Sequence, residues 1–353
     1  MSVDLTILCG FLGSGKTTLL VDFLQSGAAS DTAVIVNEVG EIGVDGVIVD
    51  DGSQGKVPMM MLANGCVCCS LRSSLVFTVA SVLDAPRPPG SEPLRRIILE
   101  TSGLSRPGPI IASLADPELA RRGLRVNVVS TYDAQRGSLN VDTYDEAVAQ
   151  LAAASRVVFT KMDIADPSSL TAHREVMTRV NPLADLVVEP SRAQAVEQAF
   201  AEMNTRAPQD LAAQALRLAG QRGNVWGNAL NQQTRFAEAA GTDTPNHDRV
   251  TVLLGRRSSP VSWDDLAQWL DDLAGGCGER LLRVKAIVKV NDAEGPILIQ
   301  SVGTTFSAPQ VLARQVIEES ICVVIVRDLD ATQINGFFLD PVFSLMDSTD
   351  LVQ

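Results

Sequence analysis

Histidine, aromatic residues and long apolar runs are all scarce in this sequence. Only two of the 353 residues are histidine, and phenylalanine, tyrosine and tryptophan together make up 4%. No uninterrupted apolar run approaches the roughly 20 residues that a membrane-spanning helix needs, so we expect no membrane association. The first residues lack the pattern of a secretory signal, because Lys16 interrupts the first apolar stretch. These absences favour a cytoplasmic protein.

Positive charge is scarce as well. The sequence contains 29 lysines and arginines against 42 aspartates and glutamates, which gives a formal net charge of −13. Such a surface repels the phosphate backbone of nucleic acids, so we expect no nucleic-acid partner. The hydrophobic fraction of 46% is ample for a core, and the length suits two domains.

A complete phosphate-binding motif lies near the amino terminus. The apolar run 5–9 is followed by GFLGSGKT at residues 10–17, and residues 17–24 have the apolar spacing of a helix. Backbone N–H groups of such a loop and helix N-terminus surround phosphate oxygens, whereas the alternative is a glycine-rich turn that binds nothing. We expect Lys16 to reach the β- and γ-phosphates and the Thr17 hydroxyl to ligate Mg²⁺. The predicted nucleotide-binding residues here are Gly10, Gly13, Ser14, Gly15, Lys16, Thr17 and Thr18.

Half of the six cysteines are clustered in one short segment. Cys66, Cys68 and Cys69 fall within four residues, and thiolates are the soft ligands that Zn²⁺ and Cu(I) prefer. Three thiolates are one ligand short of a closed structural zinc site, and an open position suits a site that must release its ion. We therefore predict a transition-metal site, with a buried or redox-active cysteine pair as the alternative.

The other three cysteines carry no such signal. Cys9 and Cys322 stand in apolar runs that predict buried strands, where a thiol behaves as a small hydrophobic group. Cys277 follows two glycines, and we expect it in a loop.

Carboxylates follow the second apolar run, residues 33–36. Glu38, Glu41 and Asp45 lie in a glycine-punctuated segment that predicts a loop. Their oxygens suit Mg²⁺, or they complete the thiolate site in one state. We include Glu38 and Glu41 in the predicted metal site, and solvated loop carboxylates are an equally weighted alternative.

The apolar run 96–99 ends in Glu100, and Gly103 follows three residues later. A carboxylate at the end of a buried strand is what a P-loop hydrolase uses to organise Mg²⁺ and water beside the γ-phosphate. We expect the Gly103 amide to sense that phosphate. The predicted catalytic residues are Lys16, Glu100 and Gly103.

The apolar run 156–159 leads into Thr160, Lys161, Met162 and Asp163. Guanine-specific proteins use an Asn/Thr-Lys-x-Asp loop at this place, with the aspartate accepting hydrogen bonds from guanine and the lysine stem covering the ring. Adenine offers no such donor pair. We therefore predict GTP as the nucleotide, bound by Thr160, Lys161 and Asp163.

These motifs, in this order, resemble the CobW-type P-loop GTPases, a family related to the GTPases that serve urease and hydrogenase maturation. The resemblance rests on GFLGSGKTT, NEVGEIGVD, NGCVCCSLR, ETSGLSRP and TKMD, and it extends to residues 250–303. It implies GTP hydrolysis, a metal on the Cys-x-Cys-Cys motif, usually zinc, and delivery of metal to a client metalloprotein. Many members carry a histidine-rich stretch. This sequence has only His173 and His247, both expected at the surface, which argues against metal storage.

The predicted fold class is α/β: a P-loop domain with a mostly parallel sheet and a smaller α/β C-terminal domain. The predicted boundaries are 1–205 for the GTPase domain, 206–248 for a helical connector and linker, 249–340 for the CobW-like C-terminal domain, and 341–353 for a frayed tail. Whether the protein forms a homodimer is left open.

The predicted function is a GTP-hydrolysing metallochaperone that uses GTP, Mg²⁺ and Zn²⁺ or another transition metal. One alternative is a non-catalytic binding module that responds to GTP and metal. Another is an activator or assembly factor for a cobalt or iron enzyme, of the cobalamin-biosynthesis or nitrile hydratase type, which only the family resemblance supports. A small-molecule kinase is disfavoured by the guanine-type loop at Thr160–Asp163.

Overall fold

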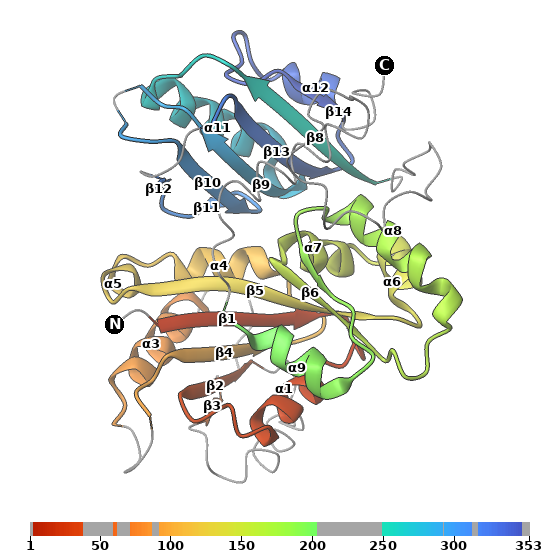
Figure 1. Cartoon of the computed structure of the whole chain (residues 1–353). Helices are drawn as coiled ribbons and strands as arrows, with labels where there is room; N and C mark the ends of the chain where they lie inside the picture. Colours follow the sequence, from red (N-terminus) through yellow and green to blue (C-terminus); the bar gives the residue numbers. More distant parts are fainter. Residues whose placement is uncertain are drawn as a thin grey trace. The chain divides into compact units, whose positions relative to one another are not determined.

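The computed structural model describes residues 3–37, 59–61, 71–86, 92–202, 249–291, 293–312 and 317–347. The chain divides into two compact units (Figure 1). The first holds the described residues up to Met177 together with 184–202, and the second holds most of those from 249 onward. The predicted connector, 206–248, lies outside the described residues.

The first unit is built on a seven-stranded sheet in which every recorded pairing is parallel. The strand order is β3-β2-β4-β1-β5-β6-β7, so the first strand of the chain is central. Parallel strands are buried on both faces and read as continuous apolar runs, which is why the sequence made them easy to locate. The strands are β1 (Val3–Gly10), β2 (Thr32–Asn37), β3 (Met59–Met61), β4 (Arg96–Thr101), β5 (Leu124–Asp133), β6 (Arg156–Thr160) and β7 (Asp185–Val187).

Helices connect these strands and cover both faces of the sheet, as parallel connections require. On one face α1 contacts α9, and on the other α4 contacts both α3 and α7 (Figure 1). The helical elements of this part are α1 (Lys16–Gln25), α3 (Leu71–Asp84), α4 (Pro107–Leu114), α5 (Pro117–Arg121), α6 (Gly137–Thr143), α7 (Asp145–Ala153), η1 (Pro167–Ser169), α8 (Leu170–Val180) and α9 (Arg192–Phe200).

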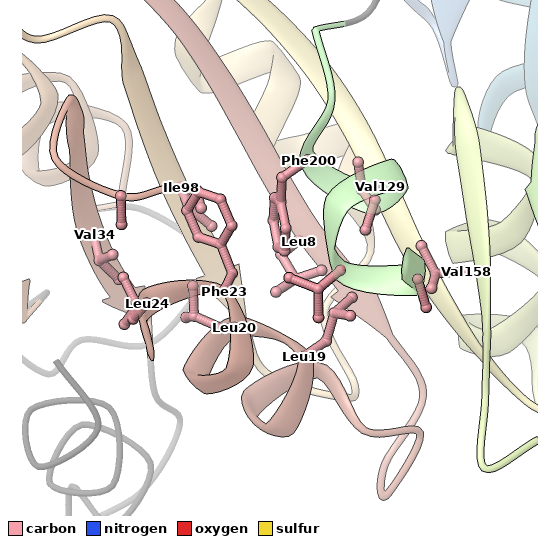
Figure 2. Packing of buried hydrophobic residues seen from close by; sticks show 14 of the residues in the cluster. Leu8, Leu19, Leu20, Phe23, Leu24, Val34, Ile98, Val129, Val158 and Phe200 are labelled. Atoms are coloured by element: carbon pink, nitrogen blue, oxygen red, sulfur yellow. The ribbon is translucent and has the colours of Figure 1, made fainter. Parts of the chain in front are cut away.

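A hydrophobic core joins α1 and α9 to the sheet (Figure 2). Phe23 of α1 and Phe200 of α9 meet with ring centroids 4.5 Å apart. Leu19 and Leu20 extend the same apolar stripe along α1. Because this packing anchors α1 along its length, it holds the first turn of the helix at the end of β1. The loop between β1 and α1 is therefore fixed at both of its ends.

The second unit contains an antiparallel sheet with the strand order β11-β10-β9-β13-β8-β14, and β12 also pairs with β10. The predicted mixture of strands and helices is present, but the strands β9 to β13 follow one another with no described helix between them, so the predicted alternation holds only in part. The strands are β8 (Val250–Arg257), β9 (Leu281–Val288), β10 (Ile297–Val302), β11 (Thr305–Phe306), β12 (Gln310–Val311), β13 (Ser320–Arg327) and β14 (Leu345–Asp347). The helical elements are α11 (Trp263–Cys277), η2 (Gly278–Arg280) and α12 (Ala331–Asn335).

The prediction of a frayed tail is wrong for residues 341–347. Phe343 is fully buried and packs against Trp269, with ring centroids 5.3 Å apart, and Leu345 is buried as well. The Asn335 side chain donates to the Leu345 carbonyl and accepts from its N–H, at 2.7 and 2.9 Å. Alternating apolar residues let this segment join β8 as an edge strand, and its short length hid that pattern in the sequence.

The prediction of a loop at Cys277 is also wrong. Helix α11 continues to Cys277, whose side chain is buried. Gly276 has a packing role here, because a Cβ atom on it would lie 2.5 Å from the ring of Phe337. One of the two glycines that indicated a loop, Gly276, therefore permits close approach of an aromatic side chain to the helix.

Candidate functional site

The loop between β1 and α1 depends on glycine for its path. Gly10, Gly13 and Gly15 have φ angles of 143°, 69° and 89°, a region that other residues rarely adopt. Gly15 is the N-cap of α1, and no side chain caps the helix there. A helix that begins after a glycine-rich loop, without a side-chain cap, is the arrangement that binds phosphate at helix N-termini.

Lys16 is the first residue of α1 and is largely buried. Its ammonium group donates to the Phe11 carbonyl at 3.4 Å, so the side chain curls back over the loop. Ser14 is buried within the loop, and its hydroxyl lies 2.6 Å from that of Thr131 on β5. Thr18, by contrast, is exposed in the first turn of α1. The loop is therefore tied to the neighbouring strand as well as to its own helix.

Thr17 and Glu100 meet although 83 residues separate them. The Thr17 hydroxyl donates to Glu100 Oε1 at 2.6 Å, and the glutamate is only 2% exposed. The parallel pairing of β1 with β4 places Glu100 opposite Leu8, which comes two residues before Gly10 of the loop. A hydroxyl and a carboxylate are oxygen donors of the kind that Mg²⁺ prefers, so this pair fits that ion.

Gly103 packs directly against the phosphate-binding loop. A Cβ atom built on Gly103 would lie 2.8 Å from both the backbone N and the Cα of Leu12. Contacts that short to backbone do not occur, so only glycine allows the segment after β4 to approach this closely. The structure thus brings Lys16, Thr17, Glu100 and Gly103 together, although their chemical roles remain predictions.

Gly103→Ala is expected to weaken nucleotide binding by roughly 10- to 100-fold. The added methyl group displaces the loop backbone, and such overpacking costs about 1–3 kcal/mol of free energy. Titration with a fluorescent guanine nucleotide measures the effect. Gly275→Ala is the matched control, since a Cβ atom there meets nothing within 4 Å. Unchanged affinity in Gly103→Ala would show that the segment moves away when nucleotide binds.

The predicted guanine loop contacts the phosphate-binding loop through Thr160. The Thr160 hydroxyl is placed 2.7 Å from the Ser14 carbonyl, to which it donates. Lys161 has a positive φ of 57°, and its ammonium group pairs with the buried carboxylate of Asp133 at 2.6 Å. Asp163 is exposed at the surface. Its carboxylate is accessible to a ligand, and the hydroxyl of Thr160 links the two halves of the site.

Sequence reasoning missed Asp133 and Gln150. Asp133 ends β5 and also accepts from the N–H groups of Gln135 and Arg136, at 2.8 and 3.2 Å. The available signal was a carboxylate at the end of an apolar strand, the same signal that identified Glu100. Gln150 is a fully buried amide in α7, and nothing in the local sequence distinguishes it from a surface glutamine.

The expectation of a surface position for His173 is wrong. His173 is 7% exposed, and its Nδ1 lies 2.9 Å from the Tyr132 hydroxyl. The polar neighbours of His173 in the sequence lie on the outer side of α8, whereas the histidine itself faces the core. His247 lies outside the described residues.

The predicted metal ligands Glu38, Glu41, Cys66, Cys68 and Cys69 also lie outside the described residues, as does Asp45. Among the residues that are described, no group of three or more histidine, cysteine, aspartate or glutamate side chains is arranged to hold a metal ion.

The three described cysteines are poor metal ligands. Burial raises the pKa of the Cys9 thiol to about 12 and that of Cys277 to about 11, and it raises the pKa of Cys322 further. At neutral pH these groups are protonated thiols, and the thiolate is the form that binds metal. The confirmed burial of Cys9 and Cys322 agrees with the apolar runs in which they stand.

A parallel sheet with this loop after its central strand, a buried glutamate beside it and a Thr-Lys-x-Asp loop defines the P-loop GTPase class. Family comparison agrees: residues 4–188 match the CobW/HypB/UreG nucleotide-binding domain, and residues 250–340 match the cobalamin synthesis protein cobW C-terminal domain. The chain belongs to the CobW/HypB/UreG family of P-loop GTPases.

Curated relatives cover most of the chain. It is similar to the zinc chaperone YjiA of Escherichia coli, with 27% identity over 312 residues that span 87% of this chain and 88% of the relative. It is similar to the zinc chaperone CobW of Sinorhizobium, with 26% identity over 328 residues and 85% of each chain. The crystal structure of Zn(II)-bound YjiA GTPase from E. coli shares the fold at a TM-score of 0.61 and 20% identity, covering 96% of this chain and 98% of that one.

None of the described helices combines the length and apolar character needed to cross a membrane.

Proposed function

We propose that this protein hydrolyses GTP and couples the reaction to holding a transition metal, zinc first, and delivering it to a client metalloprotein. The observation that carries the hydrolase part is the contact of Thr17 with buried Glu100, beside Lys16. The metal part is supported by relatives named as zinc chaperones. A Schizosaccharomyces pombe relative, 27% identical over 190 residues, is named zinc-regulated GTPase metalloprotein activator 1.

Hydrolysis rests on positioning and charge. Lys16 and the N–H groups at the start of α1 bind the β- and γ-phosphates of GTP. Thr17 and Glu100 would hold Mg²⁺, which when bound neutralises charge that develops on the phosphates. Glu100 orients the attacking water, and the Gly103 amide donates to the γ-phosphate. All four groups already lie around one loop, so little rearrangement is needed when substrate binds.

Guanine selection is assigned to the loop after β6. The Asp163 carboxylate accepts hydrogen bonds from N1–H and the exocyclic amine of guanine. Asp133 holds the ammonium group of Lys161, so the aliphatic stem of that lysine is fixed in place to cover the ring. The Thr160 hydroxyl keeps this loop in register with the phosphate-binding loop.

Metal binding is assigned to Cys66, Cys68 and Cys69. The three described cysteines are protonated and buried, so they do not compete for the ion. A three-thiolate set leaves one tetrahedral position open, which Glu38 or Glu41 fills in one nucleotide state. In the sequence, both carboxylates and the cysteines lie between the phosphate-binding loop and Glu100. A change at the γ-phosphate therefore acts on both ends of the metal-bearing segment.

The zinc affinity of the full-length protein is expected to be at least about 5-fold higher with a non-hydrolysable GTP analogue than with GDP, a typical coupling free energy of about 1 kcal/mol. Competition with a chromophoric zinc chelator measures both values. Equal affinities would rule out the coupling, since a ligand shifts an equilibrium only through differential affinity.

Two cysteine variants serve as controls for that measurement. Cys68→Ser should lose zinc in both nucleotide states and keep GTP turnover. Cys277→Ala, which removes a thiol from α11, should keep both properties. Negligible turnover with and without zinc would instead favour a non-catalytic module that responds to GTP and metal.

A further inference from the structure

One side chain of α7 holds the segment that follows β4. Gln150 is fully buried, and its Nε2 donates to the carbonyl of Gly103 at 3.0 Å and to that of Ser105 at 2.9 Å. The two N–H bonds of a single amide group thus hold carbonyls on both sides of Leu104. Leu104 itself is exposed, so the segment is held by its backbone and not by burial of its central side chain.

The same helix makes a second contact one turn earlier. Glu146 pairs with Arg106 at 3.0 Å, and residues four apart on a helix lie on one face. Gln150 and Glu146 together therefore face the segment from Gly103 to Arg106. On its other side the segment packs against Leu12 of the phosphate-binding loop.

Gln150 is itself fixed by its surroundings. The Cys9 thiol donates to its backbone carbonyl at 3.9 Å, which ties α7 to β1 just before the phosphate-binding loop. Gln150 also lines a small cavity, with room for about one water molecule, beside Phe11, Ser14 and Asp133. Its Oε1 is buried without a hydrogen-bond partner among the described residues. Gln150 therefore adjoins the phosphate-binding loop and the end of β5.

Glycine explains why such a restraint matters. Glycine has more backbone freedom than any other residue type. The N–H group of Gly103 nevertheless needs a single orientation if it is to donate to a γ-phosphate. Contact with Leu12 limits where Gly103 lies, and the hydrogen bond to its carbonyl orients the peptide plane between Gly103 and Leu104, which restrains the preceding plane that carries the Gly103 N–H. One amide group that holds the carbonyls of Gly103 and Ser105 leaves the segment little freedom.

We propose that Gln150 is a positioning residue of the GTPase site, which orients the Gly103 amide and thereby sets the preference of the protein for GTP over GDP. The proposal rests on the proposed function and deepens it. Gln150 contacts neither phosphate nor base. It acts only through the backbone of Gly103–Ser105, so its loss affects the nucleotide that carries a γ-phosphate and spares the other.

Two substitutions in the full-length protein test this role. Gln150→Met keeps the length of the side chain and removes the donor. The expected result is a roughly 10- to 30-fold lower affinity for a non-hydrolysable GTP analogue, the loss of two neutral hydrogen bonds, with GDP affinity unchanged. Turnover should fall by a similar factor. Gln198→Met, an exposed glutamine on α9, is the matched control and should change neither affinity.

Gln150→Glu adds a pH-dependent readout. An ionised carboxylate facing two carbonyls repels them, so the GTP preference should be lost at high pH. Burial raises the pKa of such a carboxyl group, and its protonated form regains one donor. Part of the preference should therefore return as the pH falls, while wild type shows no matching change.

The possible outcomes distinguish a failure of the proposal for Gln150 from a failure of the proposed function. Equal losses for GTP analogue and GDP in Gln150→Met would mean a purely structural role and would overturn the proposal. So would an unchanged affinity ratio in a variant whose thermal melting shows that it is folded. Absence of GTP turnover in wild type contradicts the proposed function instead, and the affinity ratio still decides the role of Gln150 because it requires no hydrolysis.

Discussion

Lys16→Ala is expected to lower GTP turnover by a factor of roughly 10²–10³, the usual cost of losing one preorganised group that stabilises transition-state charge. Lys16 begins α1, and its ammonium group is held over the loop by the Phe11 carbonyl. No other lysine is described in that loop or in the first turn of α1. Phosphate release under single-turnover conditions measures the loss directly.

Two further variants sharpen the Lys16 prediction. Lys16→Arg keeps the charge but should remain severely impaired, because a planar guanidinium group does not fit a pocket shaped for a compact ammonium group. Lys289→Ala, whose side chain donates to the Glu318 carbonyl in the second unit, should leave turnover unchanged. Zinc binding should survive in all three variants. Wild-type turnover in Lys16→Ala would place the hydrolytic site elsewhere.

Asp163→Ala is expected to lower GTP affinity by roughly 10²–10⁴, since it removes two hydrogen bonds to a charged acceptor at about 1.5–3 kcal/mol each. Inosine triphosphate, which lacks the exocyclic amine, provides the decisive comparison. Wild type should bind it about 10- to 100-fold more weakly than GTP. Asp163→Ala should bind both nucleotides equally, because the group that reads the amine has gone.

The four affinities form a thermodynamic cycle that isolates the contact between Asp163 and the amine. Asp166→Ala is the matched control. Asp166 is exposed nearby, and its carboxylate accepts from the Ser168 N–H at 2.9 Å as the cap of η1, with no assigned contact to nucleotide. If Asp163→Ala retained the preference for GTP over inosine triphosphate, another group would have to read the base.

The parallel sheet was predictable because its strands are buried on both faces and appear as short apolar runs. The runs at 5–9, 33–36, 96–99 and 156–159 all lie within strands of the structure. The edge strand β14 was not predictable, because three residues are too few to show alternation. His173 was misplaced because which side of a helix is buried depends on what packs against it. Cys277 was misplaced because the two glycines before it disfavour a helix locally, and tertiary packing overrides that preference.

Some residues of the candidate site were likewise predictable from the sequence, and others were not. The residues of the phosphate-binding loop are contiguous, so the motif of glycines, lysine and threonine can be recognised without knowing the tertiary structure. Glu100 and Asp163 were identified because each follows an apolar strand. Asp133 gives that same signal and was overlooked, whereas Gln150 gives none, because its importance lies entirely in the carbonyls that it meets 45 and 47 residues away in the chain.

The sequence alone therefore determined the class of protein, and it predicted the local chemistry: a loop for phosphate, a loop for guanine and a cluster of thiols. Only the tertiary structure brought Thr17 to Glu100, Lys161 to Asp133 and Gly103 to Gln150. The physical reason is that local backbone preference acts over a few residues, whereas these contacts arise from strand order and helix packing. Strand order and helix packing depend on burial across the whole sheet, which no short motif encodes.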